Sequence, residues 1–95
     1  METLEHKKIK KRLKELHQMM VDLGPVMRGS IIFIGNKKKY SHFSLNKDKK
    51  THLIYLGKKR ESKAREYSEN YKKLLDIIEE MTTLNMTLLK EDKLL

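Results

Sequence analysis

The sequence predicts an α+β fold in which an N-terminal helix, a three-stranded antiparallel β-meander and a long C-terminal helix follow one another. Residues 3–23 and 61–90 each repeat apolar side chains at spacings of four and three, as in helices that pair along a seam. Residues 30–57 hold three short runs of strand-forming residues separated by turns. At 95 residues, the chain corresponds to a single domain over 1–95 with a small core.

The first helix is expected over residues 3–23. Gly24 and Pro25 form its stop, because glycine adopts the left-handed cap and proline cannot continue the helix. Its other faces carry a dense block of lysine and arginine between residues 7 and 14. The expected seam consists of Ile9, Leu13, Leu16, Met20 and Leu23.

Three strands are expected next. Residues 31–34 are four consecutive large apolar residues, which is typical of a strand covered on both faces. Residues 40–45 alternate, with Ser41, Phe43 and Leu45 on one face and Tyr40, His42 and Ser44 on the other. The third strand, 51–56, follows a five-residue turn at 46–50, so these two strands form an antiparallel hairpin.

The long helix is expected over residues 61–90, after a linker of Lys58, Lys59 and Arg60. Its seam reads Tyr67, Tyr71, Leu74, Ile78, Met81, Asn85 and Leu88, and flanking apolar residues at 75, 77, 84 and 89 widen the apolar face. Such a width suits a helix with more than one neighbour. Asn85 either sets the register of a dimer or faces water near the end of the helix pair, and the second interpretation is favoured.

The charge of the chain is basic and unevenly distributed. The formal net charge is +9, and residues 1–60 carry 16 Lys/Arg against 5 Asp/Glu. This asymmetry indicates a polyanionic partner, most simply nucleic acid, although solubility charge is the plainer alternative. The chain has no cysteine, which excludes disulfides and thiolate metal sites and fits a cytoplasmic protein. No apolar run approaches the roughly 20 residues of a membrane span.

The sequence predicts no enzyme, no cofactor and no metal site. No nucleotide-binding glycine motif and no arrangement of catalytic residues is recognisable. His42 and His52 could face one another across the hairpin, but a third metal ligand is lacking and surface histidines are the favoured interpretation. His6 and His17 are expected to be polar surface residues of the first helix.

The basic hairpin is the candidate binding surface. A small sheet can enter the major groove of DNA while lysines in its turns neutralise the flanking phosphates. The hypothesis is therefore a small non-enzymatic protein that binds nucleic acid, with double-stranded DNA favoured over RNA. The predicted phosphate contacts are Lys37, Lys38, Lys39, Lys47, Lys49, Lys50, Lys58, Lys59 and Arg60, and the predicted groove or stacking contacts are Tyr40, His42 and Tyr55.

The alternative is a protein-interaction module, in which the long helix joins a larger protein or a second copy of this chain through Leu74, Ile78 and Met81. In that case the basic charge is incidental. A salt-insensitive protein partner would favour this alternative.

Several short motifs follow one another within residues 20–90: Pro25-x-x-Arg28-Gly29-Ser30, the tyrosines Tyr40 and Tyr55, and the segments 69–74 and 84–85. In these motifs the chain resembles a family of small bacterial and archaeal proteins of uncharacterised function, often associated with transposase or other mobile-element genes. The resemblance implies the same order of elements and a nucleic-acid context, and it implies importance for Arg28, Gly29, Asn70 and Tyr71. Arg28 could pair with an acid of the long helix or touch phosphate. Many members carry a cysteine-rich knuckle where this chain has residues 35–39, so no zinc role carries over.

Overall fold

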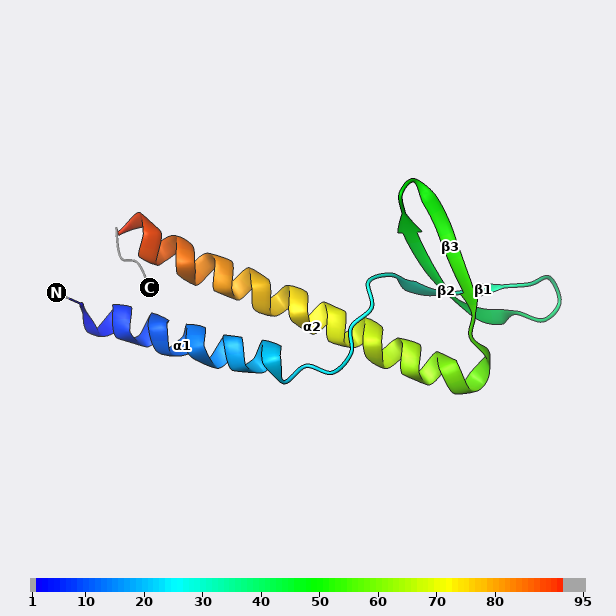
Figure 1. Ribbon diagram of the computed structural model, residues 1–95, viewed down its shortest axis with the longest axis horizontal. Helices are drawn as coiled ribbons and strands as arrows, with labels where there is room; N and C mark the ends of the chain where they lie inside the picture. Colours follow the sequence, from blue (N-terminus) through cyan, green and yellow to red (C-terminus); the bar gives the residue numbers. More distant parts are fainter. Residues whose placement is uncertain (1, 92–95) are drawn as a thin grey trace. The chain divides into compact units, whose positions relative to one another are not determined.

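A computed structural model describes residues 2–91 and confirms the α+β fold (Figure 1). The elements follow in the predicted order, from a helix through three strands to a long helix. They are α1 (Leu4–Val21), β1 (Ser30–Ile34), β2 (Tyr40–Lys47), β3 (Lys50–Tyr55) and α2 (Gly57–Lys90). Among the described residues, no helix is long and apolar enough to cross a membrane.

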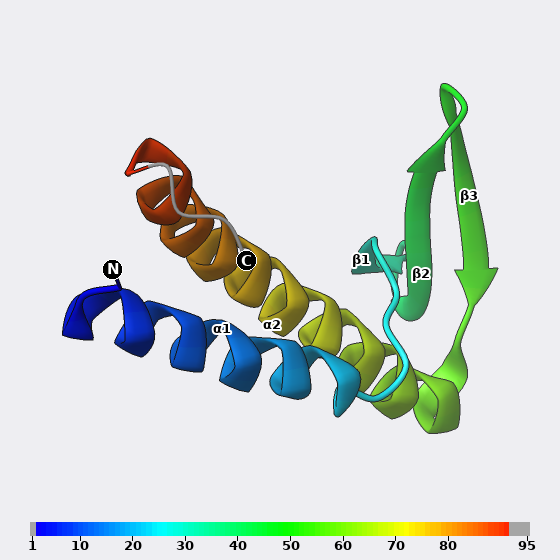
Figure 2. The same ribbon diagram turned by 60° about the vertical axis from the view of Figure 1, so that its left-hand side comes forward.

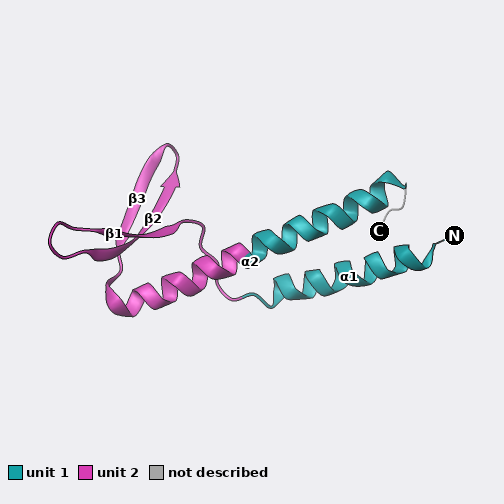
Figure 3. Cartoon of the chain, turned by 180° about the vertical axis from the view of Figure 1, so that it is seen from behind, with its two compact units in different colours: residues 1–23, 73–95 teal, residues 24–72 magenta. Residues whose placement is uncertain are grey.

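The chain divides into two compact units, and α2 contributes to both (Figure 3). The first, called the helical unit below, comprises residues 1–23 and 73–95. The second, the sheet unit, comprises residues 24–72.

In the helical unit, α1 begins with a capping box. The hydroxyl of Thr3 accepts a hydrogen bond from the backbone N–H of His6 at 3.2 Å, and the Thr3 N–H donates to Nδ1 of His6 at 3.3 Å. Two N–H groups that the first turn would leave unsatisfied are thereby paired. The helix ends at Val21, two residues before the predicted end, and Asp22 forms the C-cap.

His6 is 7% exposed, so its assignment to the polar surface is wrong. Its ring caps α1 and also bonds the carboxylate of Glu91, just beyond α2. Near the middle of the pair, Arg12 binds Glu80 through two hydrogen bonds of 2.7 and 3.0 Å. Because early α1 meets late α2, the two helices pair antiparallel.

The core of the helical unit consists of Ile9, Leu13 and Leu88, with Met81 and Leu84 packed against it. Leu16 is also buried, and Met20 and Leu23 are half-buried, so the seam predicted for α1 is confirmed. On α2 the prediction is wrong by one residue at Ile78, which is 42% exposed, whereas its neighbour Ile77 is buried. Both residues are isoleucine, and three turns of about 3.6 residues counted back from the buried Leu88 reach Ile77 and not Ile78. Asn85 is exposed, in agreement with the favoured interpretation.

In the sheet unit the strands follow the order β1-β2-β3, and both neighbouring pairs are antiparallel (Figure 2). The predicted meander is therefore confirmed. The hairpin turn is tighter than predicted, because Lys47 and Lys50 already pair and only Asp48 and Lys49 lie in the loop. These two residues have φ values of 55° and 64°, the left-handed conformation that a two-residue hairpin loop of this kind requires.

One face of the sheet packs against α2. The buried cluster on this face consists of Phe43 of β2, Ala64 of α2, and Leu56, which lies between β3 and α2. Partly buried side chains pack against this cluster: Met27, Ile31 and Leu45. The prediction that β1 is covered on both faces is wrong: Phe33 is 51% exposed and Ile34 42%. The unit supplies a single helix, which covers one face, and β1 is an edge strand.

The long helix begins at Gly57, four residues before the predicted start. Only Leu56 separates it from β3, and the side chain of Arg60 donates a 2.9 Å hydrogen bond to the Leu56 carbonyl. Lys58 and Lys59 therefore lie in the first turn of α2 and not in a linker. The three basic residues have good helix propensity, which is why the helix extends over them.

Candidate nucleic-acid interface

The predicted cations gather at the two ends of the sheet. Since β3 runs antiparallel to β2, it returns to the end at which β2 starts, and α2 begins there. The first basic cluster, at this end, consists of Lys37, Lys38, Lys39, Lys58, Lys59 and Arg60. The second basic cluster, at the hairpin turn, consists of Arg28, Lys47, Lys49 and Lys50. The eight residues of β2 separate the clusters by about 24 Å.

These cations have no acidic partners among the residues that the structure describes. Residues 24–60 contain ten Lys/Arg and one acid, Asp48. Within residues 2–91, none of these ten side chains forms an ion pair. By contrast, the helical unit pairs Arg12 with Glu80, and residues 61–72 of the sheet unit pair Arg65 with Glu61 and Lys63 with Glu66. The positive field of residues 24–60 is thus left uncompensated by ion pairs within the described residues.

Arg28 anchors the second basic cluster. Its Nη1 donates a 3.2 Å hydrogen bond to the backbone carbonyl of Asn46, whose side-chain oxygen accepts from the Thr51 hydroxyl at 2.8 Å. An acid of the long helix and a phosphate were the two partners considered for Arg28. Within the described residues, Arg28 forms no ion pair with an acid of α2. The residue remains exposed.

Arg28 and Lys47 also line a hollow of about 380 Å³, together with His52. Phe43, Leu45 and Ile54 contribute its apolar lining. The predicted phosphate contact Lys47 and the candidate nucleic-acid-binding residue Arg28 therefore lie beside an apolar hollow on the α2-facing side of the sheet. Sequence reasoning did not anticipate this hollow.

The predicted aromatic residues lie together on the other side, called the open face below. The ring of Tyr55 lies 5.6 Å from that of His42 and 6.1 Å from that of Tyr40, centroid to centroid, in edge-to-face arrangements. Tyr40 is 44% exposed and Tyr55 51%. The ammonium of Lys38 lies 5.7 Å from the centroid of the Tyr40 ring, within the range of a cation–π contact.

The tautomer of His42 follows from its hydrogen bond. Nδ1 lies 2.9 Å from the carbonyl oxygen of Tyr40, and a carbonyl can only accept. Nδ1 therefore carries the proton, which leaves Nε2 of the neutral ring as an acceptor. A hydrogen-bonding edge is thus held beside the two tyrosine rings.

Exposed apolar side chains complete the open face. Ile34 of β1 is opposite Tyr40, and Leu53 of β3 is opposite Ser44. Their exposed fractions are 42% and 49%. Sequence reasoning missed both residues, although the alternation of Thr51, Leu53 and Tyr55 along β3 is the signal that would have identified Leu53.

His42 and His52 do not face one another. His42 is opposite Tyr55 and His52 is opposite Leu45, so the two histidines lie on opposite faces of the sheet. The two-histidine arrangement considered from the sequence is therefore wrong. Within the part of the chain that the structure describes, no group of three or more His, Asp or Glu residues could hold a metal ion.

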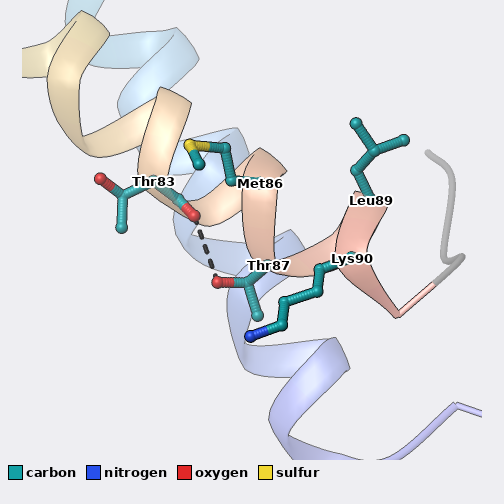
Figure 4. A pocket seen from close by; sticks show the side chains of 5 residues that line it. All are labelled: Thr83, Met86, Thr87, Leu89 and Lys90. Atoms are coloured by element: carbon teal, nitrogen blue, oxygen red, sulfur yellow. Dashed lines mark hydrogen bonds between the residues drawn. The ribbon is translucent and has the colours of Figure 1, made fainter.

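A separate hollow near the end of α2 is lined by α2 residues alone (Figure 4). Met86 and Leu89 give it an apolar character, and the Thr87 hydroxyl donates to the Thr83 carbonyl at 3.2 Å, as expected for a helical threonine. It contains none of the residues predicted for nucleic-acid contact.

Comparisons of the chain with protein-family models, with curated proteins and with solved structures find no match. The resemblance to mobile-element-associated proteins therefore stays a prediction.

Proposed function

We propose that this chain is a small non-enzymatic nucleic-acid-binding protein whose sheet unit contacts double-stranded DNA. The observation that carries the proposal is the set of ten basic side chains in residues 24–60 that have no acidic partner within residues 2–91. Phosphates would supply the missing counter-charges, and the release of their condensed cations would drive binding.

The spacing of the two basic clusters supports a duplex ligand. The major groove is about 12 Å wide, and protein strands enter it in several DNA-binding folds. A strand pair crossing that groove, with clusters about 24 Å apart, would bring one cluster toward each bordering phosphate backbone. Such contacts position a protein on DNA without reading its sequence.

The test is charge reversal within one cluster at a time. Lys37, Lys38 and Lys39 are changed together to Glu in one variant, and Lys47, Lys49 and Lys50 in another. The matched control changes Lys7, Lys8 and Lys11 of α1, which are exposed, so that the net charge falls by the same amount. Affinity for a labelled duplex is measured by fluorescence anisotropy, with an RNA duplex in parallel and circular dichroism to verify folding.

Each cluster variant is expected to bind at least about tenfold more weakly than the control, since three phosphate contacts are replaced by repulsion. Equal losses in all three variants would mean that only net charge matters, and the sheet would not be the contact surface. Tighter binding to the RNA duplex would transfer the proposal to RNA.

A second candidate function, a protein-interaction module, is favoured by a row of exposed apolar side chains on α2. Leu75 and Ile78 are each 42% exposed, Met86 64% and Leu89 65%. Of the residues first considered for this surface, Ile78 is accessible, whereas Met81 packs into the helical unit. Sedimentation equilibrium of the wild type and of Ile78→Glu tests this candidate: a dimer that dissociates in the variant supports it, and a monomer in both excludes self-association through this row.

A further inference from the structure

We propose that the open face binds unpaired DNA bases, so that the preferred ligand is a duplex with an adjoining single-stranded segment. The inference rests on the proposed function and specifies the ligand of one part of its surface. It starts from the three rings of Tyr40, His42 and Tyr55, which meet on one exposed sheet surface.

The arrangement of the rings leaves stacking surface free. All the ring contacts in this group are edge-to-face, with interplanar angles of 60° and 71°, so no ring of the group is sandwiched by another. Both tyrosines are about half exposed. Exposed aromatic rings on a sheet are what proteins use to stack successive unpaired bases.

A duplex cannot use this surface with its base faces, because those faces are covered by neighbouring base pairs. Unpaired bases present a free π-face, and stacking on an aromatic side chain tolerates any sequence. Nε2 of His42 and the hydroxyls of Ser44 and Thr51 lie on the same face and would meet the hydrogen-bonding edges of such bases.

The cations near the three rings favour a polyanion as the ligand of the open face. Tyr40 opens β2 and Tyr55 closes β3, so both lie at the end of the sheet that carries the six cations of the first basic cluster. Lys38 already contacts Tyr40. A strand whose bases stack on the rings would have its phosphates beside these cations, as in other single-strand binding grooves.

Three labelled DNAs test the inference by fluorescence anisotropy: a blunt duplex, the same duplex with a single-stranded extension, and the extension alone. The extension has about six nucleotides, which is within the number that a small single-strand-binding fold covers. The variants are Tyr40→Leu and Tyr55→Leu. Phe33→Leu is the matched control, because Phe33 is an equally exposed aromatic residue of the same sheet but lies opposite Ser41, on the other face.

The wild type is expected to bind the extended duplex about tenfold more tightly than the blunt one, and each tyrosine variant to lose about that factor while Phe33→Leu keeps it. Equal binding of blunt and extended duplexes, unaffected by either tyrosine variant, overturns this inference and leaves the proposed function standing. Binding to none of the three DNAs overturns both. If the extension alone binds as tightly as the extended duplex, the stacking inference holds and the duplex contacts of the proposed function are overturned.

Discussion

A Cβ atom added to Gly29 would lie 2.6 Å from Cζ of Phe43, the buried aromatic residue at the centre of the sheet unit. It would also lie 2.7 Å from the carbonyl oxygen of Ser44. Gly29 has a φ of 140°, which other residues rarely adopt. The glycine therefore allows the chain to pass closely over Phe43 on its way into β1.

Replacing Gly29 by alanine is expected to lower the free energy of unfolding by about 2 to 4 kcal/mol, since backbone strain and overpacking are both introduced. Urea denaturation measures the loss. Gly24→Ala is the control, because its new Cβ would meet only the side-chain nitrogen of Asn70, at 3.1 Å. Equal stability of Gly29→Ala and the wild type would contradict the packing described here.

Lys49 offers a variant that separates stability from binding. It occupies a left-handed conformation with a φ of 64°, so Lys49→Gly is expected to raise the free energy of unfolding by up to about 1 kcal/mol. The same change removes one predicted phosphate contact. The negative slope of log affinity against log salt concentration should therefore become shallower by about 0.9. Chemical denaturation and anisotropy check the two effects.

The matched control is Lys50→Gly, which removes the same charge from a regular strand position. It is expected to destabilise the sheet, because glycine inside a strand costs backbone entropy. If Lys49→Gly lost stability as well, the turn would not have the conformation described.

The Arg12–Glu80 pair predicts a pH dependence of stability. The hydrogen bonds from Arg12 lower the pKa of Glu80 below its ordinary value of 4.5. A carboxyl group whose pKa is lower in the folded state stabilises the fold at pH values above its unfolded-state pKa. This contribution of Glu80 is lost as the pH falls below 4.5.

Glu80→Gln is therefore expected to lower Tm at neutral pH by a small amount, because the pair is solvent-exposed, and the difference from the wild type should shrink in acid. Thermal denaturation followed from pH 7 downward measures it. Glu15→Gln, which removes only the contact of Arg12 within α1, is the comparison variant. A difference that grows in acid would have the wrong sign for this pair.

Much of the fold was predictable because each element has its own periodicity. The spacing of Ile9, Leu13 and Leu16 identified the buried side of α1. The choice between Ile77 and Ile78 was not predictable, since both residues are isoleucine and the small difference between a 3.5-residue and a 3.6-residue period decides which one is buried. His6 was missed because one of its two hydrogen-bond partners, Glu91, lies far away in the sequence.

The candidate site was predictable in composition and only partly in arrangement. Alternation along β2 placed Tyr40 and His42 on one face. Their contacts with Tyr55 depend on the register of β3, and that register follows from the two-residue loop at Asp48 and Lys49. A five-residue turn would have given a different pairing, so the aromatic group could not be assembled from the sequence alone.

The most direct test of nucleic-acid binding by this protein is the salt dependence of its affinity for duplex DNA. Fluorescence anisotropy of the wild type is measured at about 50 and 200 mM salt. If at least about four phosphates are neutralised by the two basic clusters, affinity should fall about a hundredfold or more over this range. No binding at the lower salt concentration, or binding that is insensitive to salt, would contradict the proposal that the unpaired cations of the sheet unit contact phosphates.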